Sequence, residues 1–186
     1  MSLAHHRRKQ PELVRQQLLE VAARLSLEQG AAGVTLDAVS QAAGVSKGGL
    51  LHHFPNKMAL LDGLFDDLTG KLDRMIAEEM RRDPVAHGRF TRAYLSCVFQ
   101  MQDEADVQGW QVLTIALLSE PQLRARWKLW VADRADEFMG TDSSAGCLLA
   151  RFAADGLWLA DILKSHDVDQ PTRQTMRSHL IALSLQ

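Results

Sequence analysis

Residues 35–61 read TLDAVSQAAGVSKGGLLHHFPNKMALL, and no other stretch constrains the fold as strongly. Two short helical patterns are separated by Ala-Gly-Val-Ser, and Phe-Pro-Asn-Lys follows the second one. Thr35 and Ser46 suit helix N-caps, and Gly44 suits the end of a helix. Pro55 prevents a simple continuation of the second helix. The stretch therefore predicts two short helices joined by a tight turn, which is a helix-turn-helix.

Helical patterns also fill the rest of the chain. Apolar residues recur at helical spacing, Gly and Pro mark the boundaries, and the alternation typical of strands is scarce. The expected helices run from about Pro11 to Gly30, over 57–82, from Asp83-Pro84, from near Gly109, from Glu120-Pro121, over 147–163, and from Asp169 to about 185. The stretch GTDSSAG at 140–146 predicts a loop. We therefore expect an all-α protein.

Charge is distributed unevenly along the chain. Residues 1–57 carry seven Lys or Arg and four Asp or Glu, a net charge of +3, whereas residues 58–186 carry a net charge of −5. A basic head on an acidic body is what a localised phosphate-facing surface produces. The boundary between the two parts falls inside the long helix that begins after Asn56.

The second helix of the motif has the features of a recognition helix. Such a helix places its N-terminal residues at base edges and phosphates in the major groove. Gly48 and Gly49 each weaken the helix by roughly 1 kcal/mol relative to Ala, which makes sense if DNA approaches closely or if the first helix packs tightly there. Leu50 and Phe54, four residues apart, are expected to anchor the helix, leaving Leu51 to face the groove.

Histidines and basic residues near the motif have two interpretations each. His52 and His53 are adjacent, so their side chains point about 100° apart and do not converge on one ion; we expect no metal site. The basic residues near the N-terminus could track phosphates or the minor groove, or could be a solvated terminus. These basic residues are His5, His6, Arg7, Arg8 and Lys9.

The motif T-L-D-A-V-S-Q-A-A-G-V-S-K-G-G-L-L-H-H-F-P-N-K resembles the signature of the TetR family of transcriptional regulators. The resemblance covers roughly residues 12–65, and it implies a dimeric, all-helical repressor whose other helices bind an inducing ligand. Thr35 and Lys57 would then contact flanking phosphates. The DNA-facing surface would comprise Ser46, Lys47, Gly48, Gly49, Leu51, His52 and His53.

This chain departs from the family pattern at two of these positions. The family usually has Tyr where this chain has Leu51, and often Thr where it has Gly49. A leucine cannot donate a hydrogen bond to phosphate, but it can contact a thymine methyl group. The departure leaves insertion into the groove intact and bears on which bases are read.

The C-terminal part, residues 58–186, contains all four tryptophans. Aromatic and Met side chains line pockets that accept flat or cationic molecules, and they also form ordinary cores. A shared chamber for an aromatic or cationic effector is one reading, and plain core is the other. The candidate effector-binding residues are Phe99, Met101, Trp110, Trp127, Trp130, Phe138, Asp155 and Trp158.

The helix over 147–163 is apolar on more than one face, so it must be buried on several sides. Together with the helix over 171–185 it predicts a four-helix interface between two subunits. The candidate interface residues are Leu148, Arg151, Phe152, Leu159, Met176, Leu180 and Leu183. Asp155 lies inside this helix and either pairs with Arg151 or meets a cationic ligand.

These patterns lead to one overall expectation. Residues 1–57 form a helix-turn-helix DNA-binding domain with a basic arm at 1–10, and residues 58–186 form a helical effector-binding and dimerisation domain. The expected protein is a homodimeric repressor that binds a palindromic operator and is released by a small molecule. The alternative is a DNA-binding protein without an effector, in which the C-terminal body only dimerises.

Other classes of protein are disfavoured by the sequence. No phosphate-binding glycine loop, nucleophile elbow or HExxH motif occurs, so we expect neither an enzyme nor a cofactor. No apolar run reaches membrane-spanning length, and no export signal is evident. The only two cysteines, Cys97 and Cys147, read as buried or free thiols. We therefore expect a cytoplasmic protein without a membrane partner.

Overall fold

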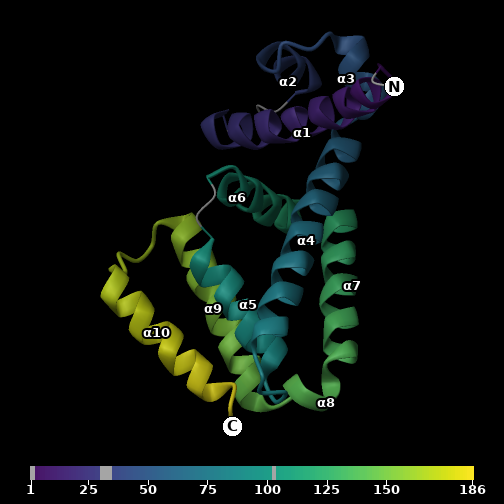
Figure 1. The fold of residues 1–186 in the computed structure, drawn as a ribbon. Coiled ribbons are helices and arrows are strands. Elements are labelled where there is room, and N and C mark those ends of the chain that lie inside the picture. The colour runs from purple at the N-terminus through teal and green to yellow at the C-terminus, as the bar shows by residue number, and fades with distance from the viewer. Residues whose placement is uncertain (1–2, 30–34, 102–103) are drawn as a thin grey trace. The chain divides into compact units, whose positions relative to one another are not determined.

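The computed structural model describes residues 3–29, 35–101 and 104–186, and in these ranges it contains ten α-helices and no strand (Figure 1). The all-α prediction is confirmed. The helices belong to two compact units. Unit 1 comprises residues 1–69 and 102–124, and unit 2 comprises residues 70–101 and 125–186. The division after residue 69 falls inside a long helix, twelve residues beyond the expected boundary at 57/58, which lies in the same helix. Unit 1 also includes a later helix, within residues 102–124, that the sequence analysis assigned to the C-terminal domain.

Unit 1 is built on α1 (Leu3–Gln29), α2 (Leu36–Ala42), α3 (Lys47–His53), the first part of α4 (Lys57–Arg82) and α6 (Glu104–Ser119). α1 packs against both α2 and α6. The core contains large side chains that are at most 2% exposed: Leu18, Leu19, Val39, Leu50, Phe54, Leu60, Leu68 and Leu113. These are the apolar positions that the helical spacing turns inward.

Two boundaries in unit 1 differ from expectation. α1 begins at Leu3 and contains Pro11, whereas the sequence placed Pro11 in its first turn. α6 begins at Glu104, ahead of the expected start near Gly109. Gly109 instead lies inside α6, where an added Cβ would be 3.2 Å from the Leu68 side chain. The expected helix stop at Gly30 and the side chains of the basic arm lie outside the described residues.

Unit 2 consists of the second part of α4, α5 (Arg89–Gln100), most of α7 (Pro121–Glu137), α8 (Met139–Asp142), α9 (Ala145–Leu163) and α10 (Gln170–Leu183). α5 packs against α8, α9 and α10, and α9 also packs against α10. α10 begins as predicted, because the Asp169 carboxylate caps it by accepting the Thr172 N–H at 2.8 Å. The pKa of Asp169 is lowered by hydrogen bonding to the Thr172 side chain and, to a smaller extent, to the Thr172 backbone.

The segment before α5 was predicted to be helical, and this is wrong. Asp83 accepts the Arg92 Nε–H at 2.6 Å and the Val85 N–H at 2.9 Å, and the pKa of its carboxyl is lowered chiefly by the hydrogen bond from Arg92. Arg92 also donates to the carbonyls of Val85 and His87. These bonds hold residues 83–88 as a loop, and α5 begins only at Arg89.

The stretch 140–146 was predicted to be a loop, and part of it is helical instead. α8 ends at Asp142, which is only 3% exposed. Its carboxylate accepts the backbone N–H of Thr91 at 2.7 Å, near the start of α5. Gly88 precedes α5 and offers no side chain to cap it. Asp142 therefore supplies the cap from a distant part of the chain.

Three residues hold the end of α10 in place. A Cβ on Gly146 would lie 2.2 Å from the carbonyl oxygen of Leu183, and a Cβ on Gly88 would lie 2.0 Å from that of Ser184. Gly88 also has φ +69°, which favours glycine. The Cys147 thiol donates to the Ser184 carbonyl at 3.6 Å. Glycine at positions 88 and 146 thus leaves room for the end of α10 to pack closely against α9 and the start of α5.

Candidate DNA-binding surface and ligand cavity

The helix-turn-helix is positioned by side-chain caps that the sequence predicted. Thr35 Oγ1 accepts the Ala38 N–H at 3.1 Å, and Ser46 Oγ accepts the Gly49 N–H at 3.1 Å. Gly44 has φ +65° in the turn between α2 and α3. Each cap fixes where a helix begins, so the start of α3 is set by local chemistry.

The far end of α3 is fastened to α1 and α4 through Phe54. Leu50 and Phe54 are 0% and 2% exposed, which confirms that they anchor the helix. The Arg15 guanidinium lies 5.3 Å from the centre of the Phe54 ring. On α4, a Cβ added to Gly63 would be 2.6 Å from the Phe54 ring. The ring therefore fills a slot that a glycine leaves open, and the sequence analysis did not identify Arg15 or Gly63.

The structure places most residues of the expected DNA-facing surface in solvent. Thr35, Ser46, Lys47, Gly48, Leu51, His52 and Lys57 are exposed, whereas Gly49 and His53 are partly buried. Leu51 is 38% exposed, whereas the neighbouring Leu50 is buried. The rings of His52 and His53 lie edge to face with centres 5.5 Å apart.

The two glycines of α3 have different surroundings. An added Cβ at Gly48 would meet nothing within 4 Å, so no packing requirement explains this glycine. At Gly49 it would lie 3.0 Å from Val45 Cγ1 and 3.2 Å from Ser46 Oγ. Gly49 is therefore close-packed against the turn, whereas Gly48 leaves the backbone at the start of α3 open to a partner.

Lys47 has a partner within the motif. Its Nζ lies 2.9 Å from Asp37 Oδ1 on α2, and both side chains are more than half exposed. An exposed ion pair of this kind contributes about 0.2–1 kcal/mol. The pair therefore orients the lysine without binding it firmly.

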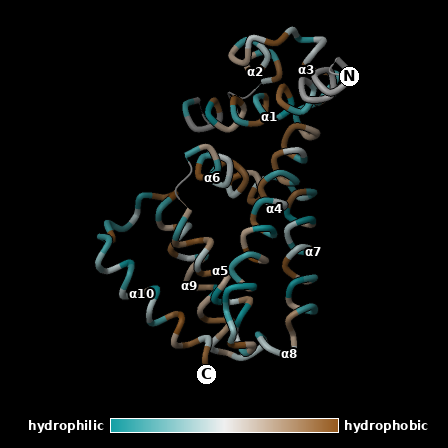
Figure 2. The backbone as a smooth tube through the Cα atoms, in the orientation of Figure 1, coloured by the Kyte–Doolittle hydropathy of each residue, from teal (hydrophilic) through white to brown (hydrophobic). Residues whose placement is uncertain are grey.

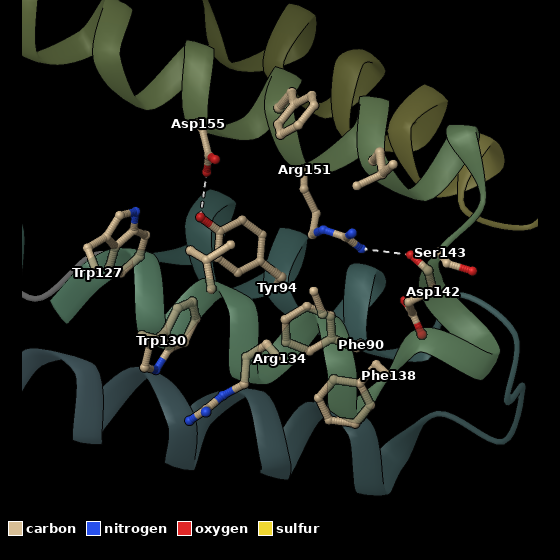
Figure 3. A pocket seen from close by; sticks show the side chains of 14 residues that line it. Phe90, Tyr94, Trp127, Trp130, Arg134, Phe138, Asp142, Ser143, Arg151 and Asp155 are labelled. Carbon is tan, nitrogen blue, oxygen red and sulfur yellow. Dashed lines mark hydrogen bonds between the residues drawn. The ribbon is translucent and has the colours of Figure 1, made fainter. Parts of the chain in front are cut away.

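Unit 2 contains a cavity of about 260 Å³ with aromatic walls (Figure 3). The residues that line it come from α5, α7, α8, α9 and the links on either side of α8. They are Phe90, Tyr94, Trp127, Trp130, Val131, Arg134, Ala135, Phe138, Asp142, Ser143, Leu148, Arg151, Phe152 and Asp155. The Phe90 and Phe138 rings stack with centres 4.6 Å apart. The size is close to the lower end for small-molecule sites, about 300 Å³.

One wall of the cavity is a ladder of planar groups on α7. Trp127 and Trp130 stack with ring centres 4.9 Å apart and an angle of 10° between the rings. The Arg134 guanidinium lies 4.9 Å from the centre of the Trp130 ring. Asp73 on α4 accepts from Arg134 Nη2 at 2.6 Å and from Trp130 Nε1 at 3.1 Å. Asp73 therefore holds Trp130 and Arg134, two of the three groups of the ladder.

A carboxylate and a phenol meet at another part of the wall. Tyr94 donates its hydroxyl proton to Asp155 Oδ1 at 2.5 Å. Asp155 lines the cavity, and partial burial of its carboxyl group raises the pKa of this group. The hydrogen bond from Tyr94 and the positive charge of Arg151 act in the opposite direction and lower the pKa. Burial and the neighbouring carboxylate raise the pKa of Tyr94 well above 10, so it stays a donor at neutral pH.

Arg151 is engaged elsewhere. It donates to Thr91 Oγ1 at 2.5 Å and to the Asp142 carbonyl at 3.2 Å, and its guanidinium lies 5.6 Å from the centre of the Phe90 ring. Asp155 is paired with Tyr94 rather than in an ion pair with Arg151. Of the two alternatives for Asp155, the one with Arg151 as its partner is therefore not realised.

The structure brings together only half of the candidate effector-binding residues. Trp127, Trp130, Phe138 and Asp155 line the cavity, whereas Phe99, Met101 and Trp158 do not. Trp110 is 8% exposed and belongs to unit 1. The sequence analysis missed Phe90, Tyr94 and Arg134; only Arg134 had a local signal, since it follows Trp130 by one helical turn.

The candidate dimer residues also divide. Leu148, Arg151 and Phe152 line the cavity, Leu180 is buried inside unit 2, and Met176 and Leu183 are partly buried. Leu159 is 41% exposed. It belongs to an exposed face of α9 that the structure leaves uncovered, described next.

One exposed face of α9 carries apolar residues from Ala145 to Leu163, and the hydropathy colouring of Figure 2 marks the helix as largely hydrophobic. Its members follow one another in steps of four and three residues: Ala145, Leu149, Phe152, Gly156, Leu159 and Leu163. Leu149, Phe152 and Leu163 are each at least 58% exposed, and Phe152 borders the cavity as well as this face. We call these six residues the α9 seam. The pattern is that of helices that pair with another helix.

The described part of the chain shows neither a metal-binding cluster nor a membrane span. No three His, Cys, Asp or Glu side chains gather there to hold an ion, and no helix there is long and apolar enough to cross a bilayer. Cys97 and Cys147 are both buried and unlinked, and burial raises the pKa of Cys97 to about 12.

Comparison with known proteins relates both ends of the chain to one family. Residues 18–64 match the family described as bacterial regulatory proteins, tetR family, and residues 88–185 match the tetracyclin repressor-like C-terminal domain. The HTH-type transcriptional repressor KstR2 of Rhodococcus jostii (strain RHA1) is 33% identical over 84 residues, which cover 43% of this chain and 41% of KstR2. The match therefore spans less than half of that relative.

A second relative and two solved structures match along most of the chain. The HTH-type transcriptional regulator BetI of Escherichia coli O45:K1 (strain S88 / ExPEC) is 24% identical over 92% of this chain and 93% of BetI. A TetR-family member from Streptomyces coelicolor A3 has a TM-score of 0.69 at 19% identity, covering 91% of this chain and 97% of that one.

The multidrug binding protein EbrR, solved in complex with malachite green, has a TM-score of 0.66 at 21% identity, covering 91% and 96%. These structural likenesses show the fold. The sequence matches account for the helix-turn-helix and for more than half of the chain beyond it. The chain belongs to the TetR family of helix-turn-helix, DNA-binding transcriptional regulators.

Proposed function

We propose that the protein is a ligand-responsive repressor that binds a palindromic operator as a homodimer and releases it when a small aromatic cation enters the unit 2 cavity. The observation that carries the proposal is the cavity wall of stacked tryptophans together with Asp155. Aromatic faces attract cations by about 0.5–2 kcal/mol each. A carboxylate with a phenol as its partner adds a counter-charge.

EbrR supports this choice of ligand class, because it was crystallised with malachite green, a flat aromatic cation. The α9 seam supports the homodimer. Gly156 has open space where a Cβ would stand, so a second helix could approach closely at the middle of the seam. A two-fold axis there would relate two copies of α3, which matches the symmetry of a palindromic site.

A coupled titration tests the proposal. Duplexes recovered by genomic footprinting are labelled, and the anisotropy of the protein–DNA complex is followed as malachite green is added. The expected result is release of DNA, together with a loss of malachite green affinity in the presence of DNA by the same factor. If a panel of aromatic cations and neutral aromatics leaves the complex intact, the C-terminal body serves only to dimerise.

The DNA-facing surface leads to a prediction about Lys57. This exposed residue begins α4, and its proposed role is a phosphate contact. Lys57→Ala is expected to weaken binding to all duplexes alike and to reduce the salt slope of log K by about one. Lys128→Ala, at an exposed position of α7, is the control and should leave the slope unchanged.

His52→Ala should act differently, by altering which operators are preferred. His52 is exposed on α3 beside Leu51, where its ring can reach base edges. Binding-site selection with randomised duplexes measures the preference, and His166→Ala provides the control. An unchanged preference would mean that the groove-facing side of α3 has been assigned wrongly.

The raised pKa of Asp155 makes cation binding depend on pH. A cation favours the ionised carboxylate, so its affinity is expected to rise as pH increases from the ordinary Asp value of 3.8 through the raised pKa of Asp155. Benzyltrimethylammonium is a suitable probe, because its charge does not change with pH. Asp155→Asn should bind it more weakly and with a flatter pH profile; an equal profile in both proteins would exclude Asp155 from the site.

A further inference from the structure

The cavity already contains a cation of its own. The Arg134 guanidinium covers the Trp130 ring at 4.9 Å, and its side chain is only 23% exposed. Trp127, Trp130 and Arg134 succeed one another along the same face of α7, as Figure 3 shows. In this ladder Arg134 makes the contact that a flat cationic ligand would make. It therefore occupies the position that such a ligand needs.

Arg134 also stands between two hollows. Phe90, Arg134 and Phe138 line the cavity, and the same three residues line a neighbouring hollow of about 420 Å³. The remaining walls of that hollow come from α4 and the end of α7: Asp73, Ile76, Ala77, Met80, Arg81 and Glu137. If Arg134 moves away from Trp130, the partition between the two spaces is reduced. The cavity can then hold a molecule larger than its present volume.

The contacts of Arg134 tie it to α4. Asp73 is its ion-pair partner at 2.6 Å and also accepts from Trp130 Nε1. A cation that displaces Arg134 from the ring leaves Asp73 exposed to the incoming charge. The carboxylate can then serve as a counter-ion to the ligand, so the site exchanges one cation for another without a net change in local charge.

We infer, on the basis of the proposed function, that Arg134 competes with the ligand for the face of Trp130. Arg134 thereby sets the specificity of the cavity, because a ligand must be an aromatic cation that can replace it on this ring. The inference makes opposite predictions for cations and anions. Removing the Arg134 charge favours a bound cation and disfavours a bound anion. A cavity that used Arg134 only to bind an acidic ligand would lose affinity for the anion in the variants without binding the cation more tightly.

The experiment compares wild type with Arg134→Gln and Arg134→Met, which remove the charge with and without a polar end group. Dissociation constants are measured by calorimetry and by quenching of tryptophan fluorescence. The cationic probe is malachite green, and the anionic aromatic probe is 1-anilinonaphthalene-8-sulfonate. Lys128→Gln is the matched control, because it removes one exposed positive charge from the same helix outside the cavity lining. Circular dichroism verifies that each variant is folded.

The expected result is that both Arg134 variants bind malachite green about tenfold more tightly than wild type, whereas Lys128→Gln does not. Binding of the anionic probe should weaken or stay constant. Tighter binding in only one of the two variants also supports the inference, and so does binding in a variant when wild type shows none, since the competitor has been removed.

Two results overturn the inference and separate it from the proposed function. If wild type binds malachite green and neither folded Arg134 variant binds it more tightly, Arg134 is no competitor, although the cavity still binds cations. If the anionic probe binds wild type and is lost in the variants, while malachite green binds the variants no more tightly, Arg134 is a ligand-binding cation instead. If no protein of the set binds either probe, the proposed effector cavity and the inference fail together.

Discussion

Gly146→Ala is expected to lower the free energy of unfolding by about 3 kcal/mol or more. The new Cβ would lie 2.2 Å from the Leu183 carbonyl oxygen, a backbone atom that cannot rotate aside. α9 and α10 must then separate, and the Cys147 contact to the Ser184 carbonyl would be lost with them. A loss of this size is a large fraction of the 5–15 kcal/mol that stabilises a typical domain.

Urea unfolding followed by circular dichroism and tryptophan fluorescence measures this effect. Gly140→Ala is the matched control, because its Cβ would meet nothing within 4 Å and alanine is favoured in a helix. The control should match or slightly exceed the wild-type midpoint. Equal midpoints for Gly146→Ala and Gly140→Ala would mean that α9 and α10 are not held this closely in solution.

The second large effect is expected from Leu159→Glu on the α9 seam. In a two-fold dimer this change places two carboxylates opposite each other at an apolar interface, where burying an unpaired charge is strongly unfavourable. The protein should become monomeric at micromolar concentration. Operator affinity should fall by about 10²-fold or more, because two half-sites are no longer bound by one linked pair of recognition helices.

Analytical ultracentrifugation and anisotropy on a palindromic duplex measure both consequences. Leu129→Glu is the control, since Leu129 is 63% exposed on α7 and lies outside the seam. That variant should remain dimeric and bind the operator like wild type. A Leu159→Glu protein that stays dimeric would show that another surface joins the subunits.

Features governed by local chemistry could be predicted from the sequence. Thr35, Ser46 and Asp169 each cap a helix through a bond to a residue three positions later, so a short stretch of sequence contains all the information. The anchoring of α3 by Leu50 likewise follows from helical spacing.

Features held by distant contacts could not be predicted. α8 lies where a loop was expected, and its last residue, Asp142, caps α5 by accepting the N–H of Thr91. The two residues are 51 positions apart in the chain, so no local pattern reveals the contact. Residues 83–88 are a loop where a helix was expected because Arg92 binds Asp83 and two carbonyls. Tyr94 and Asp155 are 61 residues apart, and no spacing rule joins them.

The tryptophans illustrate the same limit within one residue type. Composition indicated an aromatic chamber, yet it could not say which rings would share it. Trp127 and Trp130 line the cavity because they lie on one face of α7, whereas Trp110 is buried in unit 1. Helical periodicity predicts on which face of a helix a tryptophan lies, whereas the tertiary fold determines whether that face borders the cavity or the core.

The slot that holds Phe54 has a consequence for how a signal can reach DNA. Arg15 and the backbone at Gly63 enclose the Phe54 ring. Because this contact fixes the end of α3 against the start of α4, α3 cannot tilt independently of α4. In the proposed homodimer, the helix-turn-helix would therefore move as a rigid body whenever operator recognition changes. A bound ligand would then alter the distance between the two recognition helices and leave the structure of each helix-turn-helix unchanged.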